Sequence, residues 1–491
     1  MQEATRPGLR RISSPLNRFL RERAPLKALA IWLVYLAKTE GLLTRAQVLR
    51  LLAQAVAEID ELLGRQVNAI LHHPDFQRLE ASWRGLHYLV QQVPEGAGIK
   101  VRVLHLPWRE LCRDLERAME FDQSQLFHKV YEEEFGTPGG QPYGALIGDY
   151  EVRHRVAPGS PTDDMRALQR VASVAAAAFA PFIAGAHPAL FELDSFAELD
   201  QPLDLSRTFT SPNHLQWRTL RHTEDARFVA LTLPRILMRL PYDGAKPRGD
   251  GFHFRETIAG PDRDHYLWGN AAYAFGAVLV RTFADCGWLA AIHGQPTGGT
   301  LGGGLVTELP VHSFRTDPER VAPRPSTDAL ITDRLEKELG ELGFIPLCHC
   351  PDTDLAVFAG AQSVQLPGTY DEPAATANAK LSSMLQYILC VARFAHFLKI
   401  LARDKLGSFA TPEILEDHLN RWLMNYTTTN EASDEETLAR YPLREAQVRI
   451  REHPNRPGKF MCVIHLKPHT QVDQVATSIR LMTELAPLRG R

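Results

Sequence analysis

The sequence has only six cysteines in 491 residues, and they are spread from Cys112 to Cys462. Such sparse spacing is not a disulfide framework, so we expect a reduced, cytosolic environment. Charge of one sign is not in large excess either, because the formal net charge is only −3. A chain with so little net charge does not attract nucleic acid or an anionic membrane as a whole.

Sequence motifs of catalysis are also missing. The chain contains neither the G-x-S-x-G elbow of hydrolases nor the H-E-x-x-H motif of zinc enzymes. The glycine-rich stretch 294–306, GQPTGGTLGGGLV, lacks the Gly-Lys-Ser/Thr of a Walker loop and the G-x-G-x-x-G of a dinucleotide site. We interpret it as a surface loop. We therefore expect no catalytic residue, no cofactor and no metal.

Two short patterns carry metal-ligand residue types but favour packing. His72 and His73 are adjacent, so on a helix their side chains would diverge by about 100°. Pro74 follows them and indicates a boundary between two helices. Cys348 and Cys350 share one face of a predicted strand, but no second pair of ligands accompanies them. We expect both patterns to be structural.

Long apolar runs are absent as well. The run ALAIWLVYLA at 28–37 is too short to span a bilayer, which needs about 20 residues. Six arginines between Arg6 and Arg23 precede it, but KTEG follows, so the cleavage site of a signal peptide is missing. The run is either a membrane or polyanion contact or a buried helix behind a flexible arm. We favour the buried helix, with no stable membrane insertion.

Two amphipathic helices are predicted in 44–97. Thr44 and Gln47 form a capping box, and a near-heptad apolar seam follows them through 48–70. A second helix begins after Pro74 and carries an apolar stripe of Phe76, Leu79, Trp83, Leu86 and Val90. Both stripes are suited to a core or to a partner subunit. The candidate interaction residues on them are Leu52, Val56, Ile59, Leu63, Phe76 and Trp83.

Strands and helices alternate from residue 98 onward, which predicts an α/β fold. Strands are predicted at 98–107, 143–150 and within 227–241. Helices are predicted at about 108–120, from Thr162 or Asp163 to near Pro181, at 267–288 and at 377–403.

The last part of the chain is predicted to be β. Residues 444–467 form a hairpin and 477–485 a further strand. Both faces of the strand 460–466 are largely apolar, so we expect it to be covered on two sides. We hypothesise that the hairpin is completed by strands from neighbouring subunits, and that 477–485 is one such donated strand. The candidate interaction residues here are Phe460, Val463, Ile464, Ile479 and Leu481.

Several blocks, taken in order, resemble a single known family. They include HHPDFQRLEASWRGLHYLV, YGALIGDYEV, LTLPRILMRLPY, YLWGNAAYAFGA, LGFIPLCHC and LKPHTQVDQVATSIRLMTEL. The chain resembles the large sheath subunit of the bacterial type VI secretion system, the TssC (EvpB/VipB) family, over about residues 58–485. Residues 1–45 and the long glycine loop depart from the usual pattern of that family.

The resemblance implies a mixed α/β fold like that of contractile phage tail sheaths. We expect a basic arm and short apolar helix at 1–43, a helical segment at 44–97, a central α/β region at 98–375, and a C-terminal helical and β region at 376–491 that carries linking strands. The family is structural. Its members pair with a small subunit, TssB, and polymerise on a baseplate into a helical tube around the Hcp inner tube. The tube contracts, and a ClpV ATPase then dismantles it.

Two other interpretations remain open at this stage. A cytosolic α/β enzyme would combine the 294–304 loop with the strand that holds Cys348 and Cys350. A sheath subunit of another contractile injection machine would share most of the features above. Nucleotide or metal binding by the isolated chain would favour the enzyme, whereas filaments formed only with a small partner would favour a sheath.

Overall fold

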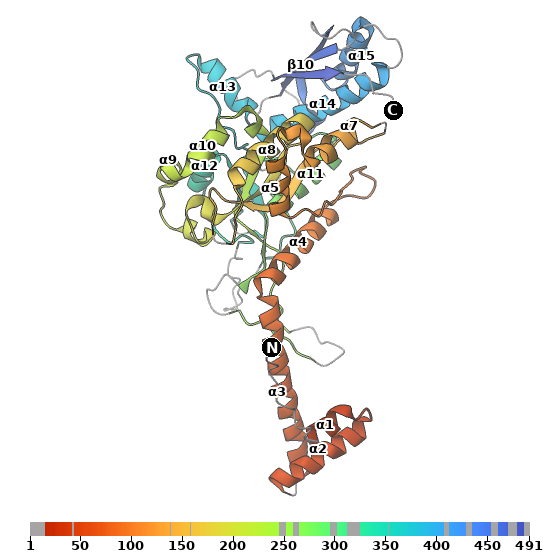
Figure 1. Ribbon diagram of the computed structural model, residues 1–491, viewed down its shortest axis with the longest axis vertical. Coiled ribbons are helices and arrows are strands. Elements are labelled where there is room, and N and C mark those ends of the chain that lie inside the picture. The colour runs from red at the N-terminus through yellow and green to blue at the C-terminus, as the bar shows by residue number, and fades with distance from the viewer. Residues whose placement is uncertain are drawn as a thin grey trace, which may run out of the picture. The chain divides into compact units, whose positions relative to one another are not determined.

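A computed structural model of the chain is shown in Figure 1. It describes residues 15–41, 44–137, 139–157, 159–244, 252–258, 265–294, 302–311, 325–351, 353–406, 412–428, 435–452, 460–469 and 479–485. The chain divides into two compact units. Unit 1 comprises Met1–His73 and Pro241–Ala259, and unit 2 comprises Pro74–Leu240 and Gly260–Arg491.

The helices of unit 1 are α1 (Pro15–Arg21), α2 (Pro25–Glu40) and α3 (Arg45–Leu71). α3 begins as predicted. The Thr44 hydroxyl accepts a hydrogen bond from the Gln47 N–H, and the Gln47 side chain accepts one from the Thr44 N–H. These two bonds satisfy main-chain groups that the first turn of a helix leaves unpaired.

The apolar run 28–37 lies in α2, but the prediction that it forms a buried helix is wrong for this chain. None of its residues is buried, and Val34 and Tyr35 are 59% and 50% exposed. The reason is that α2 has little to pack on within unit 1, since α3 has no buried residue either. Both helices present apolar side chains to the solvent.

The paired histidines lie where the sequence placed them, between two helices. His72 caps α3, and α4 (Pro74–Gln91) begins two residues later. The His72 imidazole contacts the buried carboxylate of Glu256 at 3.1 Å, and Asn68 exchanges two hydrogen bonds with Thr257. These side chains join the end of α3 to the returning segment 252–258. His72 is therefore a structural partner of a carboxylate.

The core of unit 2 is a six-stranded sheet in the order β1-β2-β3-β7-β8-β6. Its strands are β1 (Leu146–Val152), β2 (Phe182–Ala186), β3 (Val229–Leu233), β6 (Leu305–Val306), β7 (Phe344–His349) and β8 (Ala356–Phe358). β1, β2, β3 and β7 run parallel to one another, and β8 runs antiparallel to both of its neighbours, β7 and β6. β2 and β3 are buried at every position, as expected for parallel strands covered on both faces.

Helices cover both faces of this sheet. One face carries α5 (Trp108–Arg117), α8 (Asp164–Ala178), α10 (Leu215–Arg221) and α12 (Asp333–Glu341). The other face carries α4 and α11 (Ala272–Cys286). The predicted cap of α8 is confirmed, because the Asp163 side chain accepts the Arg166 N–H at 3.1 Å.

Short elements complete this region. They are α6 (Gln125–Phe127), α7 (Glu133–Phe135), α9 (Leu205–Thr210), a π-helix (His128–Glu132), the strand pair β4 (Ile236–Leu237) and β5 (Trp268–Gly269), and 3-10 helices at Phe121–Gln123, Pro188–Phe191, Phe196–Asp200, Pro212–His214 and Glu224–Phe228. The strand predicted at 98–107 is absent: the segment is extended but not paired with any strand. A strand needs a hydrogen-bonded neighbour, and the single chain does not provide one here.

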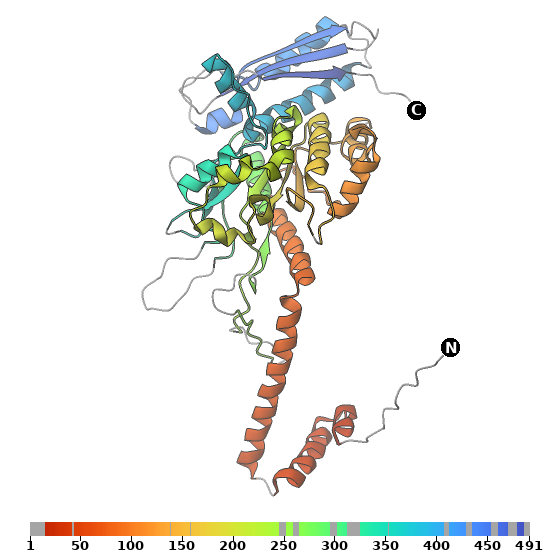
Figure 2. The ribbon, with the colours of Figure 1, turned by 60° about the vertical axis from the view of Figure 1, so that its left-hand side comes forward.

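The C-terminal part of unit 2 pairs a helical layer with a second sheet (Figure 2). The helices are α13 (Pro373–Ser382), α14 (Leu385–Leu406), α15 (Pro412–Met424) and α16 (Glu435–Arg440), and the sheet has the order β11-β10-β9, with β9 (Leu443–Glu452), β10 (Phe460–Pro468) and β11 (Ile479–Leu485). The single helix predicted at 377–403 is therefore two helices. The break at Ser383 and Met384 allows Met384 to bridge to Gln362.

One helix of the described residues is long and apolar enough to cross a membrane, the stretch Leu385–Arg403 in α14. That stretch is 72% buried inside the protein. It packs on Trp288 and on the helices and strands that follow it. The ring of Phe394 stacks on that of Trp288, with ring centroids 3.9 Å apart. Its apolar composition is thus explained by a core position.

Candidate functional site

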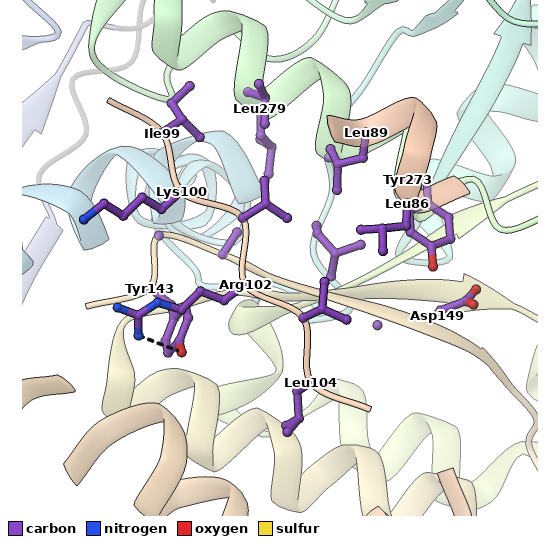
Figure 3. A pocket seen from close by; sticks show the side chains of 18 of the residues that line it. Leu86, Leu89, Ile99, Lys100, Arg102, Leu104, Tyr143, Asp149, Tyr273 and Leu279 are labelled. Carbon is purple, nitrogen blue, oxygen red and sulfur yellow. Dashed lines mark hydrogen bonds between the residues drawn. The ribbon is translucent and has the colours of Figure 1, made fainter. Parts of the chain in front are cut away.

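Unit 2 has an open, mostly apolar groove of about 1520 Å³ beside the edge strand β1. α4, α11 and α14 line it together with β1 and the extended segment 98–107. Figure 3 shows Ile99, Lys100, Arg102 and Leu104 of this segment with Leu86, Leu89 and Leu279 of the helices. We call this feature the edge groove.

The groove contains main-chain groups that make no main-chain hydrogen bond within the described chain. β1 pairs with β2 on one side only, so its other edge is free within the sheet. Within the described chain, segment 99–106 makes no main-chain to main-chain hydrogen bond. Its carbonyl at Leu106 accepts a hydrogen bond of 2.6 Å from the Tyr150 hydroxyl, which ties the end of the segment to β1. An extended peptide would find partners here.

The groove also exposes apolar side chains. Val101, Val103 and Leu104 are 38%, 68% and 59% exposed, and Trp83 across the groove is 64% exposed. A cluster of this kind on a monomer marks a surface that another molecule covers. The alternation that predicted a strand at 98–107 therefore corresponds to an extended segment with exposed apolar side chains.

Polar contacts hold the segment in place. Arg102 forms an ion pair with Glu134 and donates to the Tyr143 hydroxyl at 3.3 Å, while Lys100 donates to Gln141 at 2.8 Å. The hydrogen bonds that Arg102 donates to Tyr143 and Glu134 raise the pKa of Arg102, so its charge is maintained. These three partners come from 134–143, so the segment is fixed to α7 and to the loop before β1.

Asp149 is one of two acidic residues that line the groove, and the other is Glu151. It lies on β1 and accepts a hydrogen bond from the Ser82 hydroxyl of α4. The surrounding protein raises the pKa of Asp149 through desolvation, although bonds from Ser82 and Tyr273 oppose the rise. Its side chain still reaches solvent. An incoming peptide with a donor at this position would pair with the carboxylate.

α4 is buried on a different face from the one its apolar stripe predicted. The buried residues are Ala81, Gly85 and Leu89, which pack on α11. Phe76 and Trp83, predicted as interaction residues, remain 37% and 64% exposed. The small residues at 81 and 85 permit close approach of α11, so the larger side chains are left facing outward. Trp83 thereby becomes part of the groove wall.

The other predicted interaction residues fall in two further places. On α3, Val56, Ile59 and Leu63 are 54%, 54% and 43% exposed, and Leu52 is partly buried. In β10, Ile464 is fully buried against α14 and α15, whereas Val463 on the opposite face is half-buried. Val56, Ile59 and Leu63 thus form an exposed apolar surface of unit 1, whereas Ile464 is part of the core of unit 2.

The prediction that β10 is covered on two sides is wrong within this chain. Cys462, Ile464 and Leu466 are buried, but Met461 and Val463 are only half-buried and His465 is exposed. The predicted donated strand, β11, lies antiparallel to β10 of its own chain, with Ile464 opposite Leu481 and Leu466 opposite Ile479. The single chain thus fills the edge that we expected a neighbour to fill.

Burial disfavours the thiolate form of five of the described cysteines. It raises the pKa of Cys112, Cys348, Cys390 and Cys462 to about 12, and it also raises the pKa of Cys350. A thiol with a raised pKa stays protonated at neutral pH and is a poor nucleophile. Most of the glycine-rich loop of the enzyme hypothesis, residues 295–301, lies outside the described residues.

Exposed apolar stripes, an edge groove and a sheet with open edges are the features of a subunit that completes its surfaces by assembly. The fold and these surfaces define a structural assembly protein. Residues 53–365 match the family described as EvpB/VC_A0108, tail sheath N-terminal domain, and residues 374–485 match the tail sheath gpW/gp25-like domain of the same description. The chain therefore belongs to the EvpB/VipB tail sheath family.

One curated relative supports the same assignment. The chain is 42% identical over 433 residues to the type VI secretion system sheath protein TssC1 of Pseudomonas aeruginosa (strain PAO1). The match covers 88% of this chain and 85% of the relative. The family suggested by the sequence blocks and the mixed α/β, sheath-like fold class are thereby confirmed.

Proposed function

We propose that this chain is the large structural subunit of the contractile sheath of a type VI secretion system. In this role it pairs with a small sheath subunit of the TssB type, and the heterodimers polymerise into a helical tube. The family match over most of the chain supports a sheath role, and the edge groove supports a role in pairing. The proposed location is the bacterial cytosol.

The edge groove is the observation that carries the pairing. We propose that an extended segment of the small subunit lies in it. Such a strand would bond to the open edge of β1 and cover Val103, Leu104 and Trp83. Each main-chain hydrogen bond so formed contributes about 0.5–1.5 kcal/mol, and burial of the apolar side chains adds to it.

The tube would surround an Hcp-type inner tube, grow from a baseplate and be dismantled by a ClpV-type ATPase after contraction. The exposed seam of α3 and the C-terminal sheet are the proposed contacts between successive copies. Contraction would exchange two discrete arrangements of these packed surfaces, because close-packed interfaces switch between states rather than deform continuously.

This role requires no catalysis, and we propose that the chain is not an enzyme. The protonated thiols at 348 and 350 support this view, since they remove the reactive groups of the enzyme hypothesis. A sheath subunit of another contractile machine is the second candidate, because the matched domain is described as a tail sheath domain. Gene neighbours of the type VI system would distinguish the two.

The test is co-expression of the full chain with the small sheath subunit encoded beside it, followed by negative-stain microscopy. We expect tubes from the pair. The chain alone should aggregate or form ill-defined oligomers, because its apolar surfaces are uncovered. A well-behaved monomer by light scattering, or no tubes from the pair, would contradict the proposal.

The groove itself is tested by Val103→Asp. A carboxylate at this 68% exposed position should leave the fold intact but prevent co-purification of the small subunit. The matched control is Val156→Asp, because Val156 is 57% exposed and lies outside the groove. Equal binding of the small subunit by both variants would place the pairing surface elsewhere.

A further inference from the structure

Two buried histidines of unit 2 lie face to face beside a glutamate. His154 follows β1, Glu192 follows the 3-10 helix Pro188–Phe191, and His214 precedes α10. The two imidazole rings are stacked, with centroids 4.4 Å apart and an interplanar angle of 16°. One ligand atom from each of the three side chains lies within 4.8 Å of the other two. Sequence motifs do not reveal this cluster, because the residues lie far apart along the chain.

The His154 side chain is buried without a partner. It is 3% exposed, and neither ring nitrogen has a hydrogen-bond partner among the described residues. Leaving a buried polar group unpaired costs free energy, so native proteins usually complete it with protein, water or an ion. Burial lowers the pKa of His154 to about 4. The ring is therefore neutral at pH 7 and offers a free lone pair.

His214 is oriented by the main chain. Its Nε2 lies 2.8 Å from the Leu190 carbonyl, which only accepts, so Nε2 carries the proton. In the neutral ring Nδ1 is then the acceptor, and the Ser211 hydroxyl lies 3.2 Å from it. A backbone carbonyl that fixes one ring nitrogen is the common arrangement around metal-binding histidines, and a metal ion at Nδ1 would replace the Ser211 hydroxyl.

Glu192 supplies the negative charge. Its backbone is left-handed, with φ of 60°, a conformation that a non-glycine residue adopts rarely. One carboxylate oxygen accepts from the Asn213 amide at 2.9 Å, which leaves the other oxygen for a ligand. The bond from Asn213, together with the nearby His214, His154 and Arg155, lowers the pKa of Glu192. The group is ionised at neutral pH.

We propose that His154, Glu192 and His214 bind a divalent transition-metal ion, for which Zn²⁺ is the best fit. Two imidazole nitrogens and a carboxylate oxygen form a common three-ligand zinc set, with water as the fourth ligand. Ligand atoms of a tetrahedral zinc ion lie about 3.4 Å apart, as follows from bond lengths near 2.1 Å. The lone pair of an imidazole nitrogen lies in the plane of its ring, so the two stacked rings must turn before both can face one ion. The cluster must also contract on binding, and the exposed Glu192 side chain can rotate inward.

The ion would tie three separate segments together: the end of β1, the turn at Glu192 and the start of α10. Its effect is structural, because it binds the folded state and not the unfolded chain. The charge of Arg155 opposes a cation, since it also lowers the pKa of His154. Glu192 offsets that charge.

The test uses the full chain, alone or with its small partner, stripped with EDTA and titrated with Zn²⁺. We expect one equivalent of zinc to bind and the melting temperature to rise. Substitution with Co²⁺ should give d–d bands without thiolate charge transfer, which excludes cysteine ligands. Absence of zinc binding, or thiolate bands from the bound Co²⁺, would overturn the proposal.

Variants identify the ligands. Glu192→Gln should weaken zinc binding by about 100-fold. Glu224→Gln is the matched control, since Glu224 is 88% exposed and lies outside the cluster. His154→Phe keeps an aromatic ring against His214 but removes both unpaired nitrogens, so it should abolish the thermal response to zinc. Unchanged affinity in both Glu192→Gln and His154→Phe would overturn the proposal, and Glu192→Gln decides alone if His154→Phe does not fold.

Discussion

Gly85 is the single residue on which the packing of α4 depends most. It lies on the face of α4 that is buried against α11. A Cβ atom added there would lie 2.3 Å from the ring of Tyr273, and Tyr273 is itself buried. The absence of a side chain therefore allows the two helices to approach closely.

Gly85→Ala should lower the free energy of unfolding by about 1–3 kcal/mol, because the ring must move from a packed site. Gly64→Ala is the matched control. Gly64 lies in α3, where an added Cβ has nothing within 4 Å. That change should raise the free energy of unfolding by up to about 1 kcal/mol. Urea unfolding measures both, and equal stability of the two variants would contradict the close α4–α11 contact.

The thiols at 348 and 350 are predicted to be packing groups. Replacing both by serine should leave tube formation and bound zinc unchanged, because burial keeps Cys348 protonated. Microscopy and metal analysis of the double variant provide the measurement. Zinc that is present in the wild-type protein and lost from the double variant would show that these thiols are ligands.

At the scale of elements, sequence periodicity predicted α3, α4 and the β9–β10 hairpin well, since each has a strong local pattern. The apolar stripe of α4 was predicted to face a core or a partner, and the face that is buried within this chain is a different one. Periodicity weighs large apolar residues, whereas packing on α11 selected Ala81, Gly85 and Leu89. The alternation at 98–107 was real, but a strand also needs a neighbouring edge, and the single chain has none to offer there. The strand at 98–107 was predicted wrongly because its hydrogen-bonding neighbour is not part of the single chain.

The seam of α3 is predicted to act in assembly and not in folding. Val56→Asp with Ile59→Asp should change the free energy of unfolding by less than about 0.5 kcal/mol, because both positions are more than half exposed. The same change should prevent tubes. Gln54→Asp with Ala57→Asp adds the same charge to the opposite side of the helix and should preserve them. Tubes from the Val56 and Ile59 variant would contradict a role for the seam.

At the scale of the whole molecule, long-range contacts were beyond the sequence patterns. The order β1-β2-β3-β7-β8-β6 and the meeting of His154, Glu192 and His214 depend on how distant segments pack. The pairing of β11 with β10 of the same chain is also such a contact. A strand from a neighbouring copy could use the same edge of β10 with the same register. The two arrangements differ only in which chain supplies the strand.

We predict that β11 is exchanged between copies in the tube. Ile479→Pro or Leu481→Pro removes a main-chain donor from this strand and fixes an unsuitable geometry. Either variant should stop tube formation while leaving the heterodimer with the small subunit soluble. Ile479→Val, which keeps the donor, should still form tubes. Full-length contractile tubes from the proline variants would show that β11 is not the link.

Cross-linking separates exchange from pairing within one chain. Val463 lies opposite Met482 in the register of β10 and β11, so Val463→Cys with Met482→Cys places two thiols across the strands. Oxidation of assembled tubes should then give a ladder of covalently linked chains on a non-reducing gel, because each bond joins two copies. Oxidation of the unassembled heterodimer should give only a bond within one chain. Single chains from both samples would mean that β11 stays with its own β10 throughout assembly.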